Sequence, residues 1–170
     1  MKATGIVRRI DDLGRIVIPK EIRKSFTLHE GDSLEIFVED MNIILKKYSL
    51  IDNFDYDIKK IVDAYYKSFK KSIIITGKDK VIAVDKKMNI YDNKMLSSNI
   101  KSSISGRIDK IFSDEKIILD GENVNKFYLS SIIVDSDAIG SIVLISDEIS
   151  DKDREIISLI KEILVKNIED

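Results

Sequence analysis

The chain has no cysteine and only one histidine, His29, among its 170 residues. It can therefore form no disulfide, no thiolate nucleophile and no cysteine-based zinc site, and a single imidazole has no second one to share a metal with. The seven glycines form neither a phosphate-cradling loop nor a nucleophile elbow. We therefore expect a protein that is not an enzyme and that holds neither a metal nor a cofactor.

Long apolar runs are also missing. The sequence has no apolar stretch of eighteen residues, no basic leader followed by an apolar segment, and no lipidation signal at either end. With 44% hydrophobic and 34% charged residues, its composition is typical of globular proteins. We expect a cytoplasmic protein without a membrane partner.

Positive charge is concentrated at the N-terminus. The net charge of the chain is -2, yet residues 1–24 carry seven basic and three acidic side chains, a local balance of +4. Charge alone is also typical of a solvated face, but four of the seven are arginines, whose planar guanidinium can donate two hydrogen bonds to guanine or to a phosphate. The predicted DNA-binding residues are Lys2, Arg8, Arg9, Arg15, Lys20, Arg23 and Lys24.

The first 48 residues are patterned as a small ββαββ unit. Residues 4–10 and 15–18 favour strands on either side of a turn at 11–14, Pro19 favours the first position of a short helix, and residues 34–48 alternate as a hairpin. About 48 residues bury too little surface to be stable alone without a disulfide or a metal. We therefore expect two copies to pair in an interleaved dimer.

The remaining residues favour a second, mixed domain. Strands are predicted at 72–76, 80–84, 116–119, 127–134 and 139–146, with a polar segment at 92–105. Helices are predicted at 58–69 and from residue 150 onwards. Ser150 and Asp153 resemble a capping box at the start of the second helix. The joint at 51–57 has no glycine or proline, which predicts stiff coupling. The two apolar helices predict an oligomer interface at Ile58, Ile61, Val62, Tyr65, Tyr66, Phe69, Ile157, Ile160 and Leu164.

One run carries a family resemblance. Residues 4–23, TGIVRRIDDLGRIVIPKEIR, with GDSLEIFV at 31–38 and IILKKY at 43–48, closely resemble the DNA-binding domain of AbrB-type transition-state regulators. The resemblance implies a swapped-hairpin β-barrel formed by a dimer, with DNA contacts at Arg8, Arg15 and Arg23 and supporting contacts at Arg9 and Lys24. Lys24 departs from the second arginine that many members carry there, so bidentate base reading is not implied at that position.

The second half resembles a GAF domain of sporulation regulators that carry this head, with AIGSIVLIS at 138–146 similar to the closing strand. The expected fold is therefore α+β: an AbrB-type barrel at 1–50, a joint at 51–57, and an α/β GAF-like regulatory and oligomerisation domain at 58–170 with an antiparallel sheet flanked by helices. GAF domains often bind small molecules, which implies an effector, but the sequence identifies no ligand residues. The same barrel serves in some antitoxins, where a floppy tail covers a toxin, and the patterned tail here disfavours that use.

These patterns predict a nucleoid-associated transcription regulator, and the resemblance implies that it controls sporulation genes. Its expected partners are double-stranded promoter DNA, further copies of itself in a homodimer or homotetramer, and an unidentified small-molecule effector. The alternative is a ligand-sensing or protein-interaction module in which DNA binding is secondary.

Overall fold

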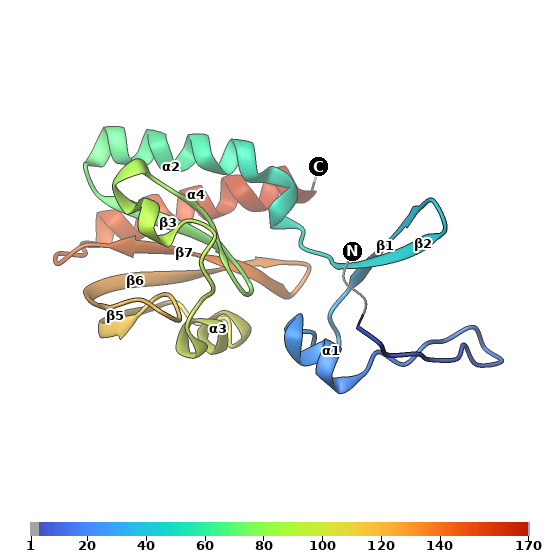
Figure 1. The fold of residues 1–170 in the computed structure, drawn as a ribbon. Helices are drawn as coiled ribbons and strands as arrows, with labels where there is room; N and C mark the ends of the chain where they lie inside the picture. Colours follow the sequence, from blue (N-terminus) through green and yellow to red (C-terminus); the bar gives the residue numbers. More distant parts are fainter. Residues whose placement is uncertain (1–3, 170) are drawn as a thin grey trace. The chain divides into compact units, whose positions relative to one another are not determined.

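The computed structural model describes residues 4–169, without the side chains of residues 52, 53, 55 and 56. The chain divides into two compact units, Met1–Tyr48 and Ser49–Asp170 (Figure 1). Each unit has its own sheet, and the two are described separately below.

The N-terminal unit contains one short helix and one hairpin. Helix α1 spans Lys20–Ser25 and starts after Pro19, whose fixed φ suits a helix start. Strands β1 (Leu34–Glu39) and β2 (Asn42–Lys47) pair antiparallel, with Leu34 opposite Lys47 and Glu39 opposite Asn42. The predicted helix and hairpin are thus present.

The two strands predicted at 4–10 and 15–18 are not formed in the single chain. The turn between them is present, closed by hydrogen bonds from Gly14 N to Asp11 O and from Asp11 N to Arg15 O, both of 3.0 Å. A strand needs a neighbouring strand for its backbone N–H and C=O groups, and within the described part of the chain no strand pairs with these two segments. The pattern therefore identified segments that could pair, but this chain does not supply the partner.

The N-terminal unit has no core of its own. Every described residue from 4 to 48 keeps appreciable solvent exposure, and fourteen of its large apolar side chains are exposed. Val38 is 77% exposed and Ile43, opposite it in the hairpin, is 72% exposed. Hydrophobic burial, the main force that stabilises a fold, is therefore limited to partly buried residues in this unit when it stands alone.

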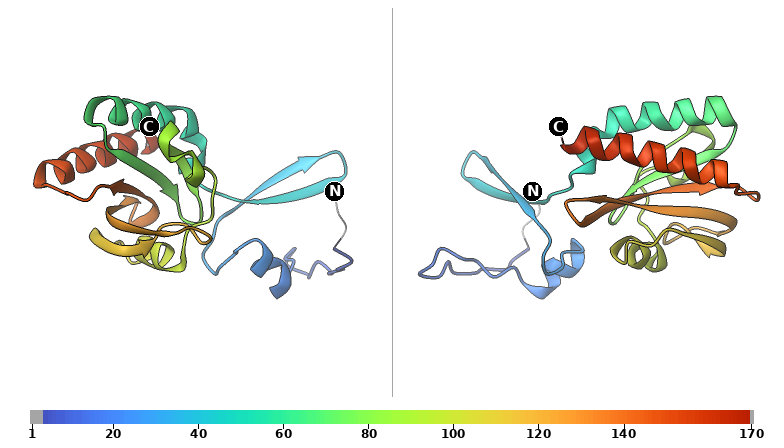
Figure 2. Two further views of the ribbon diagram at one scale, coloured as in Figure 1. Left: turned by 60° about the vertical axis from the view of Figure 1, so that its left-hand side comes forward. Right: turned by 180° about the vertical axis from the view of Figure 1, so that it is seen from behind.

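The C-terminal unit is built on a five-stranded antiparallel sheet in the order β4-β3-β7-β6-β5. Helices α2 and α4 cover one face and α3 covers the other (Figures 1 and 2). The elements are η1 (Ile51–Phe54), α2 (Asp55–Phe69), β3 (Ser72–Gly77), β4 (Val81–Val84), η2 (Lys86–Tyr91), α3 (Ser98–Ser105), β5 (Lys110–Lys116), β6 (Asn123–Val134), β7 (Asp137–Ile145) and α4 (Asp151–Glu169).

Two apolar clusters hold this unit together, one on each face of the sheet. The first packs α2 and α4 against alternate residues of β3, β6 and β7, and the second packs α3 against the opposite residues of the same strands. Ile73 and Ile74, adjacent in β3, are both fully buried and belong to different clusters, as the period-two alternation of a strand requires. The predicted mixed α+β fold with an antiparallel sheet flanked by helices is confirmed.

The strand predicted at 116–119 is misplaced. The observed edge strand β5 is Lys110–Lys116, a mostly polar segment paired with β6. Ile117 and Ile118 follow the strand and are buried in the second cluster. Their apolar character reflects this packing role, which a short apolar run does not distinguish from a strand.

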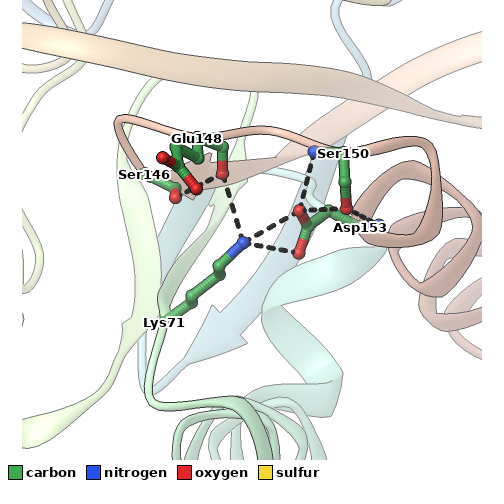
Figure 3. A network of polar contacts seen from close by, with 5 residues as sticks. All are labelled: Lys71, Ser146, Glu148, Ser150 and Asp153. Atoms are coloured by element: carbon green, nitrogen blue, oxygen red, sulfur yellow. Dashed lines mark hydrogen bonds and ion pairs between the residues drawn. The ribbon is translucent and has the colours of Figure 1, made fainter.

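The start of α4 is fixed by the polar network in Figure 3. Asp153 N donates to Ser150 Oγ at 3.2 Å and Ser150 N donates to Asp153 Oδ2 at 2.8 Å, which is the reciprocal capping pattern predicted from the sequence. Lys71, beyond the end of α2, adds hydrogen bonds of 2.9 Å to both carboxylate oxygens and one of 3.2 Å to the Glu148 carbonyl. The network therefore joins the end of α2 to the start of α4.

Candidate nucleic-acid interface

Arg15 is positioned by the turn that precedes it. One oxygen of the Asp11 carboxylate accepts hydrogen bonds from Leu13 N at 3.0 Å and Arg15 N at 2.8 Å, and the other accepts one from Arg15 Nε at 2.8 Å. Gly14 has a φ of +76°, the left-handed conformation that glycine adopts without a steric penalty. The hydrogen bonds from the backbone and side chain of Arg15 lower the pKa of the Asp11 carboxyl below its usual value. The turn thus holds the ionised carboxylate against the arginine.

The guanidinium of Arg15, although bound to Asp11, keeps hydrogen-bond donors available to solvent. Arg15 uses Nε for Asp11, its side chain is 70% exposed, and its two terminal nitrogens donate to no described group. Arg8, on the other arm of the turn, donates from Nη1 to the Val7 carbonyl at 2.9 Å and is also exposed. Two terminal nitrogens in one plane match the paired acceptors of a guanine edge or a phosphate.

Helix α1 contributes a second group of cations. Lys20, Arg23 and Lys24 are all exposed, and Arg23 N donates to Pro19 O at 2.9 Å in the helical hydrogen-bond pattern. After the helix, Asp32 accepts from His29 N at 2.7 Å and pairs with Lys47 at 3.0 Å, which ties the loop to strand β2. The hydrogen bond to His29 N and the charge and hydrogen bond of Lys47 lower the pKa of Asp32, although its burial acts to raise it.

The predicted DNA-binding residues thus lie on the first turn and on α1. Six of them are exposed cations in the N-terminal unit, while Lys2 lies outside the described residues. Residues 25–48 carry five acidic side chains against two basic ones, so the excess positive charge of this unit is confined to residues 1–24. The role of Asp11 was missed by sequence reasoning, which saw only a turn; an aspartate three residues before glycine is the signal that would have indicated it.

The predicted oligomer interface is largely internal to the chain. Phe69 is 43% exposed, and Ile61 and Tyr66 are partly exposed. Apolar surface on the outer side of α4 is found instead at Leu159 and Ile163, which are 61% and 43% exposed. The other six predicted residues are core residues of their own chain: Ile58, Val62, Tyr65, Ile157, Ile160 and Leu164.

Two of the open depressions on the C-terminal unit are lined by residues relevant to binding. One, of about 450 Å³, lies between α3 and β5 and includes Ser102 and Ser103, two of the serines in the polar segment predicted at 92–105. The other, of about 520 Å³, lies at the end of the sheet where β3 and β6 begin and β7 ends, and its lining includes four lysines. The sequence alone does not reveal this group of four lysines, because they come from three segments far apart in the chain.

Other classes of site find no support in the described part of the chain. No group of three or more histidine or acidic side chains there is arranged to hold a metal ion. None of the helices between residues 4 and 169 has the length and apolar character to cross a membrane.

Two family models match the chain one after the other. Residues 7–52 match the family model of MazE, a bacterial antitoxin described by its antidote-toxin recognition. Residues 56–169 match the family model for the C-terminal part of stage V sporulation protein T, a transcription factor. The resemblance to AbrB-type regulators with a sporulation-type second half is therefore confirmed.

Individual proteins show the same division. Stage V sporulation protein T of Bacillus subtilis strain 168 is 43% identical over 154 residues, which is 87% of this chain and 86% of the relative. The transition state regulatory protein AbrB of the same organism is 60% identical over 48 residues, 28% of this chain and 50% of the relative. Among solved structures, type II free methionine-R-sulfoxide reductase from Thermoplasma acidophilum covers 69% of this chain and 94% of its own, with a TM-score of 0.50 at 12% identity, a likeness of fold alone.

Proposed function

The chain belongs to the stage V sporulation protein T family of transcription factors, and from this premise we propose that it regulates sporulation genes by binding promoter DNA through paired N-terminal units. The observation that carries the proposal is the set of exposed arginines on the first turn and on α1, with Arg15 held in place by Asp11. In this proposal Arg8, Arg15 and Arg23 of both copies approach the grooves. Lys2, Arg9, Lys20 and Lys24 neutralise phosphates and set the register.

Pairing of two copies is supported by what the N-terminal unit lacks. The segments 4–10 and 15–18 have unpaired backbone groups, and the fourteen exposed apolar side chains of the unit need cover. A second copy supplies both, since each chain's free segments can pair with those of the other in a swapped-hairpin barrel. Pairing also brings two basic turns onto one surface, which doubles the local charge that attracts DNA.

The C-terminal unit then senses a signal or assembles the chains. Residues 1–50 form the DNA-binding domain, residues 51–57 the joint, and residues 58–170 a GAF-like regulatory and oligomerisation domain. Self-association through the α2–α4 layer uses its exposed apolar residues Phe69, Leu159 and Ile163, flanked by Ile61 and Tyr66. The protein acts in the cytoplasm on the nucleoid and performs no catalysis.

The proposal is tested by titrating a labelled promoter fragment from the source genome with the full-length chain at a series of salt concentrations. If six to eight phosphates are neutralised, the logarithm of the affinity falls with the logarithm of salt concentration with a slope of roughly -5 to -7. Arg8→Ala and Arg15→Ala are each expected to weaken binding by about 1 to 3 kcal/mol while the oligomer persists.

The matched control is Arg107→Ala, which removes an exposed arginine from the C-terminal unit and should leave DNA affinity unchanged. The alternative function, in which the chain is a ligand-sensing or protein-interaction module, would be favoured by binding that ignores both salt and the two N-terminal arginines. Loss of the oligomer in Arg15→Ala would instead assign this arginine a structural role.

A further inference from the structure

The lysine-lined depression of the C-terminal unit is not used by the proposed DNA-binding surface. Its walls come from the junction of α2 and β3, the start of η2, the start of β6 and the end of β7. Its volume of about 520 Å³ is within the range of pockets that hold small molecules, about 300 to 1,000 Å³. The charged side chains in its lining are Lys70, Lys71, Lys87, Lys126 and Asp147.

The amines of this depression are not balanced by carboxylates. Lys71 is the one lysine of the four with a carboxylate partner, Asp153 at 2.9 Å, among the residues that the structure describes. Lys70 lies over the ring of Tyr66, with Nζ 5.9 Å from its centre. Lys87 and Lys126 form no ion pair with a described residue. With Lys71 compensated by Asp153, three lysines and one aspartate remain in the lining, an excess of positive charge on a chain whose net charge is -2.

Two lining residues are shielded from solvent to different degrees. Lys126 is partly buried at the start of β6, and Ser72, at the start of β3, is only 4% exposed. An anion in the depression would accept hydrogen bonds from the ammonium of Lys126 and from the hydroxyl of Ser72, and such charge-assisted hydrogen bonds are stronger than neutral ones.

We propose that this depression binds a small molecule carrying at least two negative charges, of the phosphorylated-metabolite class. An open depression of this volume can seat a compact anion so that several of its oxygens are contacted at once, whereas a DNA backbone would contact only the rim. The amines of Lys87 and Lys126 make the main contacts, and Ser72 donates its hydroxyl to a bound oxygen. Lys71 stays with Asp153 and contributes its charge.

Inorganic pyrophosphate is the probe, titrated calorimetrically into the full-length chain. Because the N-terminal arginines also attract phosphate, every measurement uses the Arg8→Ala/Arg15→Ala/Arg23→Ala background. Pyrophosphate is expected to bind, and adding Lys87→Gln and Lys126→Gln should lower the affinity by about tenfold or more. Amide NMR signals of Ser72, Asn125 and Ser146 should shift on binding, which locates the anion.

The matched control is Lys94→Gln/Lys166→Gln, which removes the same charge from two exposed lysines outside the depression and should leave the affinity unchanged. Circular dichroism confirms that each variant is folded. An affinity that falls equally in the control, or no binding at all, overturns the proposal. Binding of duplex DNA but not pyrophosphate in this background would overturn it in favour of a backbone contact. None of these outcomes depends on whether the N-terminal arginines bind promoters.

Discussion

Tyr65 buries a hydroxyl for which the described structure offers no hydrogen-bond partner. The residue lies on α2 and is 3% exposed, with its ring 4.9 Å from that of Phe69. Burial, together with the negative charge of Asp153, raises the pKa of Tyr65 to about 12. The hydroxyl therefore stays protonated under ordinary conditions, and it costs the fold free energy because folding removes it from water without a replacement partner.

Replacing Tyr65 with phenylalanine removes this cost and keeps the ring. We expect Tyr65→Phe to leave the stability unchanged or to raise it by up to about 1 kcal/mol, as measured by urea unfolding. Tyr128→Phe is the control, since Tyr128 packs against the same cluster but is only partly buried. A loss of more than about 1 kcal/mol in Tyr65→Phe alone would show that the hydroxyl has a partner, such as bound water.

At the level of elements, α4 shows how a polar network stabilises a helix start. Burial acts to raise the pKa of Asp153, but the hydrogen bonds from Lys71 and from the backbone and hydroxyl of Ser150 outweigh it, so the pKa lies below its usual value. The ionised carboxylate is therefore the form that the native state favours. A carboxyl group with a lowered native pKa stabilises the fold at neutral pH, and this contribution is lost on acidification.

Asp153→Ala removes both the capping contact and the partner of Lys71. We expect it to destabilise the fold by about 2 kcal/mol at pH 7. The difference from the unchanged chain should hold above the ordinary aspartate pKa of about 3.9 and shrink as the pH falls below it, through the lowered native value. Unfolding in urea at several pH values measures this.

The control for this prediction is Asp151→Ala, which removes an exposed aspartate from the same helical turn. It should cost only a few tenths of a kcal/mol, the usual size of an exposed charge near a helix N-terminus. If the Asp153→Ala difference were constant down to low pH, the ionisation of Asp153 would not be the source of the stability.

The sequence predicted these elements unevenly, and the reasons are physical. Helix α2, helix α4 with its Ser150 cap and the hairpin 34–48 each have a strong local period, so they were predicted. The edge strand β5 is polar on most positions and was missed, while Ile117 and Ile118 were mistaken for it. Contacts made across long sequence separations, such as Lys71 with Asp153 and the convergence of the four lysines, carry no local signal. The basic N-terminal residues were predicted because charge and arginine content are visible in the sequence itself.

At the scale of the whole molecule, the two units differ in how much they bury. The C-terminal unit has two apolar clusters, whereas every described residue of 4–48 keeps solvent exposure. The C-terminal unit can therefore be stable within one chain. On the proposed pairing, the N-terminal unit becomes stable only when two chains associate. The stability of the N-terminal unit then depends on chain concentration, as it does for other folded states that exist only as oligomers.

Hydrogen exchange at two widely separated chain concentrations checks this difference. We expect the amides of β1 and β2 and of residues 4–18 to become better protected at the higher concentration, while those of β3 and β7 stay equally protected at both. Protection of the N-terminal amides that is independent of concentration would contradict pairing through this unit.

On the proposed pairing, an N-terminal unit without a core of its own would make gene control sensitive to the concentration of the chain. If only paired units bind DNA, then at low expression the amount of active regulator grows with the square of the chain concentration. A modest rise in synthesis would then switch promoter occupancy over a narrow interval, without any signal molecule. Dilution by cell growth would reverse the switch just as steeply. Promoter occupancy would then report the concentration of the chain itself.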